Sequence, residues 1–326
     1  MKTALRALGS VALLGLLAWR LDWTQIAEAF HRLDVRFWGL ALAVFLLAQL
    51  ISSYRWQMLA VPLGYHLPYR RYVSLYFVGM FFNLVLPTSV GGDVVRALYM
   101  GGRRPRAFLS VLAERGSGLM VLMLMACVAA LFSPVALPGW MLLVLAAIGA
   151  GMVGGVLSLP LLPAMTRLPW VGDKVPRLIQ LVHTYARLPR LLGGAAALSV
   201  LVQLASVAQV WLVCLGLGLE VPFVYLAVAV PLVTLLTLVP ISLNGMGLRE
   251  LGLVVLLGPV GVTAPQAVML SLLVFATTVA ASLLGAVCYL AGPYARIHEP
   301  VGVLDHDPAV RRDSDQGREG QPAAAA

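Results

Sequence analysis

The sequence predicts an all-α protein: a polytopic transmembrane helix bundle of about six full spans plus two re-entrant hairpins, arranged as an inverted repeat. Of its 326 residues, 60% are hydrophobic and only 11% are charged, whereas a soluble domain is about a quarter charged. The apolar runs reach about 20 residues, which is enough for a helix to cross a bilayer. Because these runs are continuous rather than alternating, they argue against a β-barrel.

Six apolar runs are expected to be full spans. The first resembles a secretory signal, because Lys2 and Arg6 precede a short apolar stretch. No small-residue cleavage site follows it, so we expect this run to be retained as a span. The expected spans are residues 4–21, 36–52, 107–132, 138–162, 191–215 and 264–292.

Two further apolar pieces, 72–100 and 223–258, contain helix breakers. They share the pattern P-x-S-x-x-G-x-x-x-R, which ends at Arg96 in the first piece and at Arg249 in the second. Broken helices at matching places in two halves of a chain are typical of a transporter's central site. The alternative is chance recurrence in a chain that is rich in glycine and proline.

The basic residues set the expected orientation, and their placement in short loops argues against nucleic acid as the partner of this chain of net charge +9. They gather in segments 1–6, 53–72, 91–106 and 163–190, whereas the short loops 133–139, 216–222 and 258–265 have none. All four basic segments can be cytoplasmic only if both interrupted pieces are re-entrant hairpins. We therefore expect a multi-pass protein of the bacterial inner membrane with its N-terminus and C-terminus in the cytoplasm.

Residues 1–295 then form one membrane domain with two similar halves, about 1–132 and 138–292. Each half has a span, an amphipathic connector in the interface, a second span, a hairpin and a third span. Three crossings separate the hairpins, so the second half is expected to be inverted relative to the first. Residues 296–326 are expected to be a disordered polar tail by composition.

Few charged residues lie within the apolar stretches or at their breaks. A charged side chain at mid-membrane costs about 2.5–3.5 kcal/mol on insertion scales, so these residues must face inward, pair with each other or border water. They form three acid–base sets: Asp93 with Arg96, Glu114 with Arg115, and Arg249 with Glu250.

Arg96 and Arg249 are the candidate phosphate ligands, because a planar guanidinium beside a glycine-rich helix start suits that group. The structural alternative is that the three sets neutralise each other and hold the hairpins in the bundle. The neutral polar side chains near the breaks are Asn83, Ser89, Ser242 and Asn244. They are expected to bind either the ligand or the backbone groups that the breaks leave without a partner.

Arg55 and Trp56, at the end of the second span, are expected either to contact a lipid head group or to serve as interface anchors. The sequence shows no phosphate-loop motif, dinucleotide fingerprint, catalytic Ser/His/Asp set or metal cluster. We therefore expect no cofactor, no bound metal and no catalytic residue.

At these residues the sequence resembles the transmembrane region of the lysylphosphatidylglycerol synthetase/flippase family. The matching signatures are Arg55-Trp56, Phe82-Asn83 with Leu86-Pro87, Gly91-Gly92-Asp93 with Arg96, Glu114-Arg115 with Gly118, and the stretch from Pro240 to Glu250. The resemblance spans nearly all of residues 1–295 and implies a flippase-like protein that moves lipids between leaflets. Family members that make aminoacylated lipids carry a cytosolic synthetase domain, which the polar tail does not resemble.

The expected function is therefore lipid transport: translocation of a phosphate-bearing or otherwise polar-headed lipid, with anionic or glycosylated membrane lipids as partners. One alternative is a non-catalytic partner of lipid-biosynthesis enzymes in a cell-envelope complex. Another is a membrane-embedded head-group transferase, for which Asp93 and Glu114 are the plausible acid–base pair. A small-anion transporter using the same site is a third, and the oligomeric state stays open.

Overall fold

The structure, a computed structural model, describes residues 33–86, 91–102, 104–158, 184–185, 187–239 and 245–292. Within these ranges the chain forms helices joined by turns, with no strand. Four helices are long and apolar enough to cross a membrane: α3 (Val35–Ala60), α6 (Arg104–Leu131), α10 (Pro189–Gly216) and α13 (Ala264–Ala291). A fifth apolar helix, α7 (Gly139–Ser158), is shorter. The prediction of an all-α, polytopic membrane bundle is confirmed.

Each interrupted apolar piece contains two helices. The first piece forms α4 (Tyr69–Val85) and α5 (Gly91–Tyr99), and the second forms α11 (Phe223–Leu238) and α12 (Leu248–Leu257). The residues that end α4 and α11, Leu86 and Val239, are extended, as expected for residues that precede a proline. The sequence breaks are therefore helix breaks, and the re-entrant path of each piece through the membrane stays a prediction.

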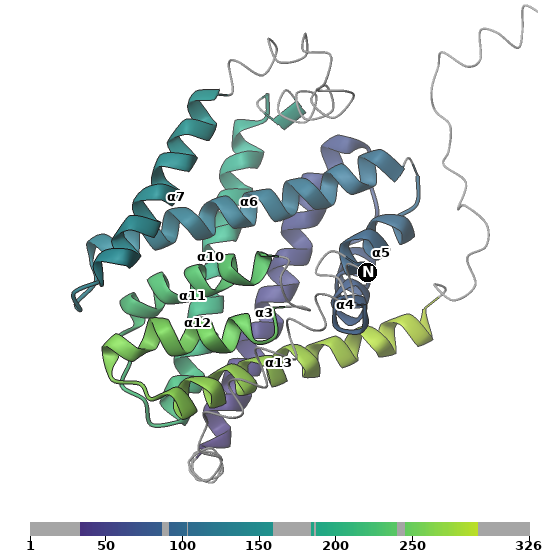
Figure 1. The fold of residues 1–326 in the computed structure, drawn as a ribbon. Coiled ribbons are helices and arrows are strands. Elements are labelled where there is room, and N and C mark those ends of the chain that lie inside the picture. Colours follow the sequence, from purple (N-terminus) through teal and green to yellow (C-terminus); the bar gives the residue numbers. More distant parts are fainter. Residues whose placement is uncertain are drawn as a thin grey trace, which may run out of the picture.

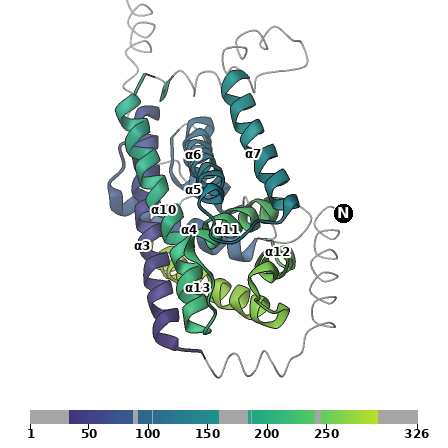
Figure 2. The same cartoon turned by 90° about the vertical axis from the view of Figure 1, so that its left-hand side faces the viewer.

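Helices of the first half of the chain pack against helices of the second half. Helices α3 and α10 lie side by side, and α6 and α13 run crosswise to them (Figures 1 and 2). Helix α4 of the first half packs against α13 of the second, and α11 of the second half packs against α6 of the first. This reciprocal packing is what a two-fold repeat requires, whereas the inversion across the membrane stays a prediction.

Aromatic and aliphatic side chains fill the space between these helices. One core surrounds Tyr225 and Leu257 in the second half, and another surrounds Trp56 and Tyr72 in the first. Large apolar side chains also cover the outside, for example Leu143 and Leu290, which are 73% and 79% exposed. An apolar outer surface of this extent suits contact with lipid tails rather than water.

The prediction for the second span was too short. Helix α3 continues from the expected end near residue 52 to Ala60, because Ser53, Arg55 and Trp56 in that last part are buried and have hydrogen-bond partners within the bundle. The first span (4–21), most of both connectors and the polar tail lie outside the described residues.

Small residues let two helix pairs approach closely. A Cβ atom added at Gly285 of α13 would lie 2.0 Å from the carbonyl oxygen of Phe77 on α4. A Cβ atom at Gly92 of α5 would lie 1.8 Å from the carbonyl oxygen of Gly79 on α4. Helix α4 therefore sits between α5 and α13 at backbone contact distance.

We expect Gly285→Ala to destabilise the protein by about 1–3 kcal/mol, because the added methyl group would force α4 and α13 apart. Thermal unfolding of the purified protein in detergent measures this. The matched control is Gly149→Ala on α7, where an added Cβ atom meets nothing within 4 Å. Equal melting temperatures for the two variants would contradict the close packing of α4 on α13.

Candidate functional site

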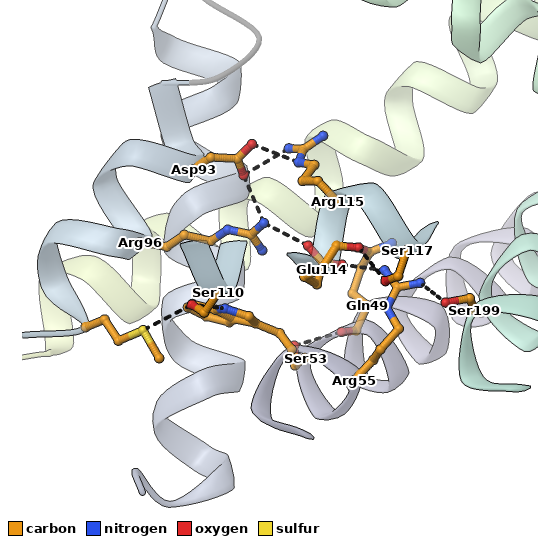
Figure 3. A network of polar contacts seen from close by, with 12 residues as sticks. Gln49, Ser53, Arg55, Asp93, Arg96, Ser110, Glu114, Arg115, Ser117 and Ser199 are labelled. Atoms are coloured by element: carbon orange, nitrogen blue, oxygen red, sulfur yellow. Dashed lines mark hydrogen bonds and ion pairs between the residues drawn. The ribbon is translucent and has the colours of Figure 1, made fainter. Parts of the chain in front are cut away.

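Five charged side chains from three helices meet beside the first helix break (Figure 3). We call this set the α5–α6 network; it consists of Arg55 from α3, Asp93 and Arg96 from α5, and Glu114 and Arg115 from α6. Four of the five side chains are at most 7% exposed. Charged groups so deep in an apolar bundle are costly unless each one is paired.

Glu114 is at the centre of this network. Its Oε1 accepts a hydrogen bond from Nη2 of Arg55, and its Oε2 accepts one from Nη2 of Arg96 at 2.9 Å. The side chain of Glu114 is 3% exposed, and each of the two arginine side chains is 4% exposed. One carboxylate on α6 therefore joins α3 and α5, which are not neighbours in the sequence.

Asp93 connects Arg96 to Arg115 of α6. One of its oxygens lies 3.0 Å from Nη2 of Arg96. Arg115 binds both carboxylate oxygens, through Nε at 2.8 Å and Nη2 at 3.0 Å. Arg115 is the open end of the network, because its side chain is 47% exposed.

Aromatic and hydroxyl side chains surround the buried guanidinium groups. The guanidinium carbon of Arg96 lies 4.9 Å from the ring centroids of both Trp56 and Tyr76, a favourable cation–π geometry. Trp56 is itself fixed by donating a hydrogen bond to Ser110 at 3.1 Å. These contacts leave Arg96 little freedom to turn towards a ligand.

Arg55 is held from the opposite side by α10. Its Nη1 donates a hydrogen bond to the hydroxyl of Ser199 at 2.7 Å. Gly118, one turn after Glu114, leaves room for this guanidinium, since an added Cβ atom would lie 3.2 Å from Nη2 of Arg55. The carbonyl of Gly118 accepts a hydrogen bond from Gln203 of α10 at 3.1 Å.

Asn83 positions the start of α5. Its Oδ1 accepts a hydrogen bond from the backbone N–H of Gly92 at 2.8 Å, which links the last turn of α4 to the first turn of α5. Of the two expectations for Asn83, this contact fits satisfaction of a freed backbone group. Ser89, Ser242 and Asn244 lie outside the described residues.

The second break carries a separate, smaller cluster. Arg249 donates a hydrogen bond from Nε to Ser271 at 2.7 Å and one from Nη2 to Glu250 at 2.6 Å. Glu250 also accepts from the hydroxyl of Ser271 at 2.8 Å and from the backbone N–H of Gly247 at 2.6 Å. Arg249, 18% exposed, lies over the ring of Phe275, and the cluster has no net charge.

The two candidate phosphate ligands, Arg96 and Arg249, belong to separate groups of polar contacts. No ion pair or hydrogen bond joins the α5–α6 network to the Arg249 cluster among the residues that the structure describes. The acid–base sets are also only partly as expected. Arg96 contacts Asp93 and Arg249 contacts Glu250, but Glu114 pairs with Arg55 and Arg96, and Arg115 pairs with Asp93, because α3 and α5 bring these partners to α6.

The burial of Arg55 and Trp56 does not fit interface anchors, whereas contact with a lipid head group stays a prediction. They are 3% and 0% exposed, and only their neighbour Tyr54 reaches the surface, at 48%. The reason is that α6 offers them polar partners, Glu114 and Ser110, inside the bundle. The partners Tyr76, Ser199 and Ser271 were not predicted from the sequence, although a lone serine in an apolar run is a weak signal for such a role.

The α5–α6 network holds three guanidinium groups and two carboxylates, so it carries one excess positive charge. Two buried N–H groups in it, Nε of Arg55 and Nε of Arg96, have no hydrogen-bond partner. The described residues contain no group of three His, Cys, Asp or Glu side chains that could hold a metal ion. The chemistry that this arrangement offers is the binding of an anion.

Replacing Glu114 by Gln is expected to destabilise the protein by about 3–5 kcal/mol, because Arg55 and Arg96 would lose their shared buried counter-charge. The melting temperature of the purified protein measures this loss. Glu220→Gln, which makes the same change at an exposed loop position, is the control. If both variants melted like the wild-type protein, the ion pairs would not be holding α3, α5 and α6 together.

Comparison with known families identifies a match over most of the chain. The model of the family described as "Lysylphosphatidylglycerol synthase TM region" matches residues 4–285. The matched region contains every residue of the α5–α6 network and of the Arg249 cluster. No curated protein and no solved structure matches this sequence.

Proposed function

We propose, from the premise that this chain belongs to the Lysylphosphatidylglycerol synthase TM region family, that it is a flippase-like lipid translocase. In this proposal it moves a phosphate-bearing or otherwise polar-headed lipid between the leaflets of the bacterial inner membrane. Membrane lipids, anionic or glycosylated, are its partners, and it acts without a cofactor.

The observation that carries this proposal is the buried α5–α6 network with its excess positive charge. Buried ion pairs contribute little net stability, and apolar residues of similar size often serve a fold as well or better. The five charged groups inside a lipid-facing bundle are therefore better explained by the binding of a polar group that passes through the bundle. A head group that crosses the membrane needs such a polar path, whereas its acyl chains can stay against the apolar outer surface.

The position of the network at a broken helix supports the same function. Helix α5 has nine residues, and its charged side chains link it to α6. A short helix with ionic contacts can shift without disrupting a long span, which alternating access requires. The carboxylates of Asp93 and Glu114 each contact two guanidinium groups, which makes them poor candidates for the acid–base pair of a head-group transferase.

One observation favours an alternative function. The Arg249 cluster is neutral and its polar atoms bind each other, as expected of charges that only hold helices together. If the α5–α6 network had the same role, the chain would be a non-catalytic partner of lipid-biosynthesis enzymes. A transport measurement separates the two functions.

We expect vesicles that contain the purified protein to expose inner-leaflet fluorescent phosphatidylglycerol to an external quencher faster than protein-free vesicles do. Arg96→Lys keeps the charge but loses the planar fork, so we expect at least a tenfold slower rate, about the value of one charge-assisted hydrogen bond. Arg104→Gln, at an exposed position on α6, is the control. If fluorescent phosphatidylglycerol, phosphatidylethanolamine and a glycolipid all moved as slowly as in protein-free vesicles, the translocase proposal would fail.

A further inference from the structure

We propose that Arg115 is the residue that contacts the transported head group, and that the lipid's phosphodiester replaces Asp93 on its guanidinium. This inference rests on the proposed function and adds two things to it: the contact residue and the ligand chemistry. The ligand is a lipid whose only charge is one phosphodiester, such as phosphatidylglycerol, so that its net charge is −1. Arg55, Arg96 and Glu114 form the fixed frame behind the contact.

Exposure separates Arg115 from the other arginines of the network. Its side chain is 47% exposed, compared with 4% for Arg55 and 4% for Arg96. It also lies well inside α6, one of the helices long enough to cross a membrane. A guanidinium exposed to lipid tails at that depth is costly, so Arg115 is expected to face a polar space that a head group can reach.

The geometry of the Arg115–Asp93 pair suits an exchange. Arg115 holds both carboxylate oxygens of Asp93, at 2.8 and 3.0 Å, and a phosphodiester presents two oxygens to the same fork. Both groups carry one negative charge, so Arg115 keeps a counter-charge throughout. Asp93 is not left unpaired either, because it retains Arg96 at 3.0 Å.

The charge of the network also points to one bound anion. Three guanidinium groups face two carboxylates, so a single phosphodiester makes the network neutral. The unpartnered Nε atoms of Arg55 and Arg96 show that the network has more donors than acceptors. The Arg249 cluster lacks this imbalance, because its arginine, glutamate and serine bind each other and their charges cancel.

The test is lipid retention by the purified full-length protein, measured by native mass spectrometry with equal amounts of dioleoyl phosphatidylglycerol and dioleoyl phosphatidylcholine. We expect the wild-type protein to retain more phosphatidylglycerol than phosphatidylcholine. In Arg115→Gln the ratio of the two retained lipids is expected to fall about tenfold, which corresponds to the loss of one charge-assisted contact. Arg115→Lys, which keeps the charge but not the fork, is expected to lie between the wild-type protein and Arg115→Gln. Arg104→Gln removes a charge from the exposed start of the same helix and should keep the wild-type preference.

Asp93→Asn provides a test in the opposite direction. This variant frees Arg115 from its competing carboxylate, so we expect stronger retention of phosphatidylglycerol than in the wild-type protein. A merely structural role for Arg115 predicts no gain. Folded Arg115→Gln and Asp93→Asn proteins that both keep the wild-type lipid preference would overturn the inference.

Two further measurements separate this inference from the proposed function. If fluorescent phosphatidylglycerol moves across the bilayer equally fast with wild-type protein and with Arg115→Gln, the translocase proposal stands and the role of Arg115 is overturned. If preference for phosphatidylglycerol depends on Arg115 but no lipid moves, the contact is supported and the translocase proposal fails. Loss of the bound lipid on addition of inorganic phosphate alone would overturn the commitment to a lipid ligand.

Discussion

The fold of the first half depends on the carboxylate of Glu114. This single side chain on α6 binds Arg55 of α3 and Arg96 of α5, and Arg55 extends the connection to Ser199 of α10. Without water as an alternative partner, the cost of an unpaired charge in an apolar bundle is high. The helices are therefore restricted to arrangements in which these groups meet, and the small residues around them follow from that restriction.

Glycine provides the space that the ion pairs require. Gly118 leaves room for the guanidinium of Arg55, and Gly92 allows α5 to approach α4 at backbone distance. The approach of α5 to α4 brings Asp93, the residue after Gly92, and Arg96, one turn later, towards Glu114. Charge and close packing thus act together: the ion pairs select the arrangement, and the glycines make it sterically possible.

The sequence predicted the helices well and the contacts between them poorly. Continuous apolar runs and Pro-Ser-Gly breaks predicted where the described helices lie, apart from the end of α3, because bilayer thickness and proline geometry act locally. The partner of Arg55 could not be predicted, since Glu114 meets it only through the crossing of α3 and α6. For the same reason the sequence did not predict that Arg55 pairs with Glu114, and it paired Glu114 with its neighbour Arg115 instead.

The shared pattern of the two breaks predicted equivalent roles for Arg96 and Arg249, and the structure shows how their surroundings differ. In the first half the acid of α5 lies one turn before its arginine, and α6 adds Glu114 and a second arginine. In the second half the acid directly follows Arg249, accepts a hydrogen bond from the backbone of Gly247, and accepts another from Ser271 of α13. One half therefore has an open, positively charged network and the other a closed, neutral cluster. This difference suits a substrate with one anionic group. A single anion would neutralise the α5–α6 network, whereas the Arg249 cluster is already neutral and needs no anion.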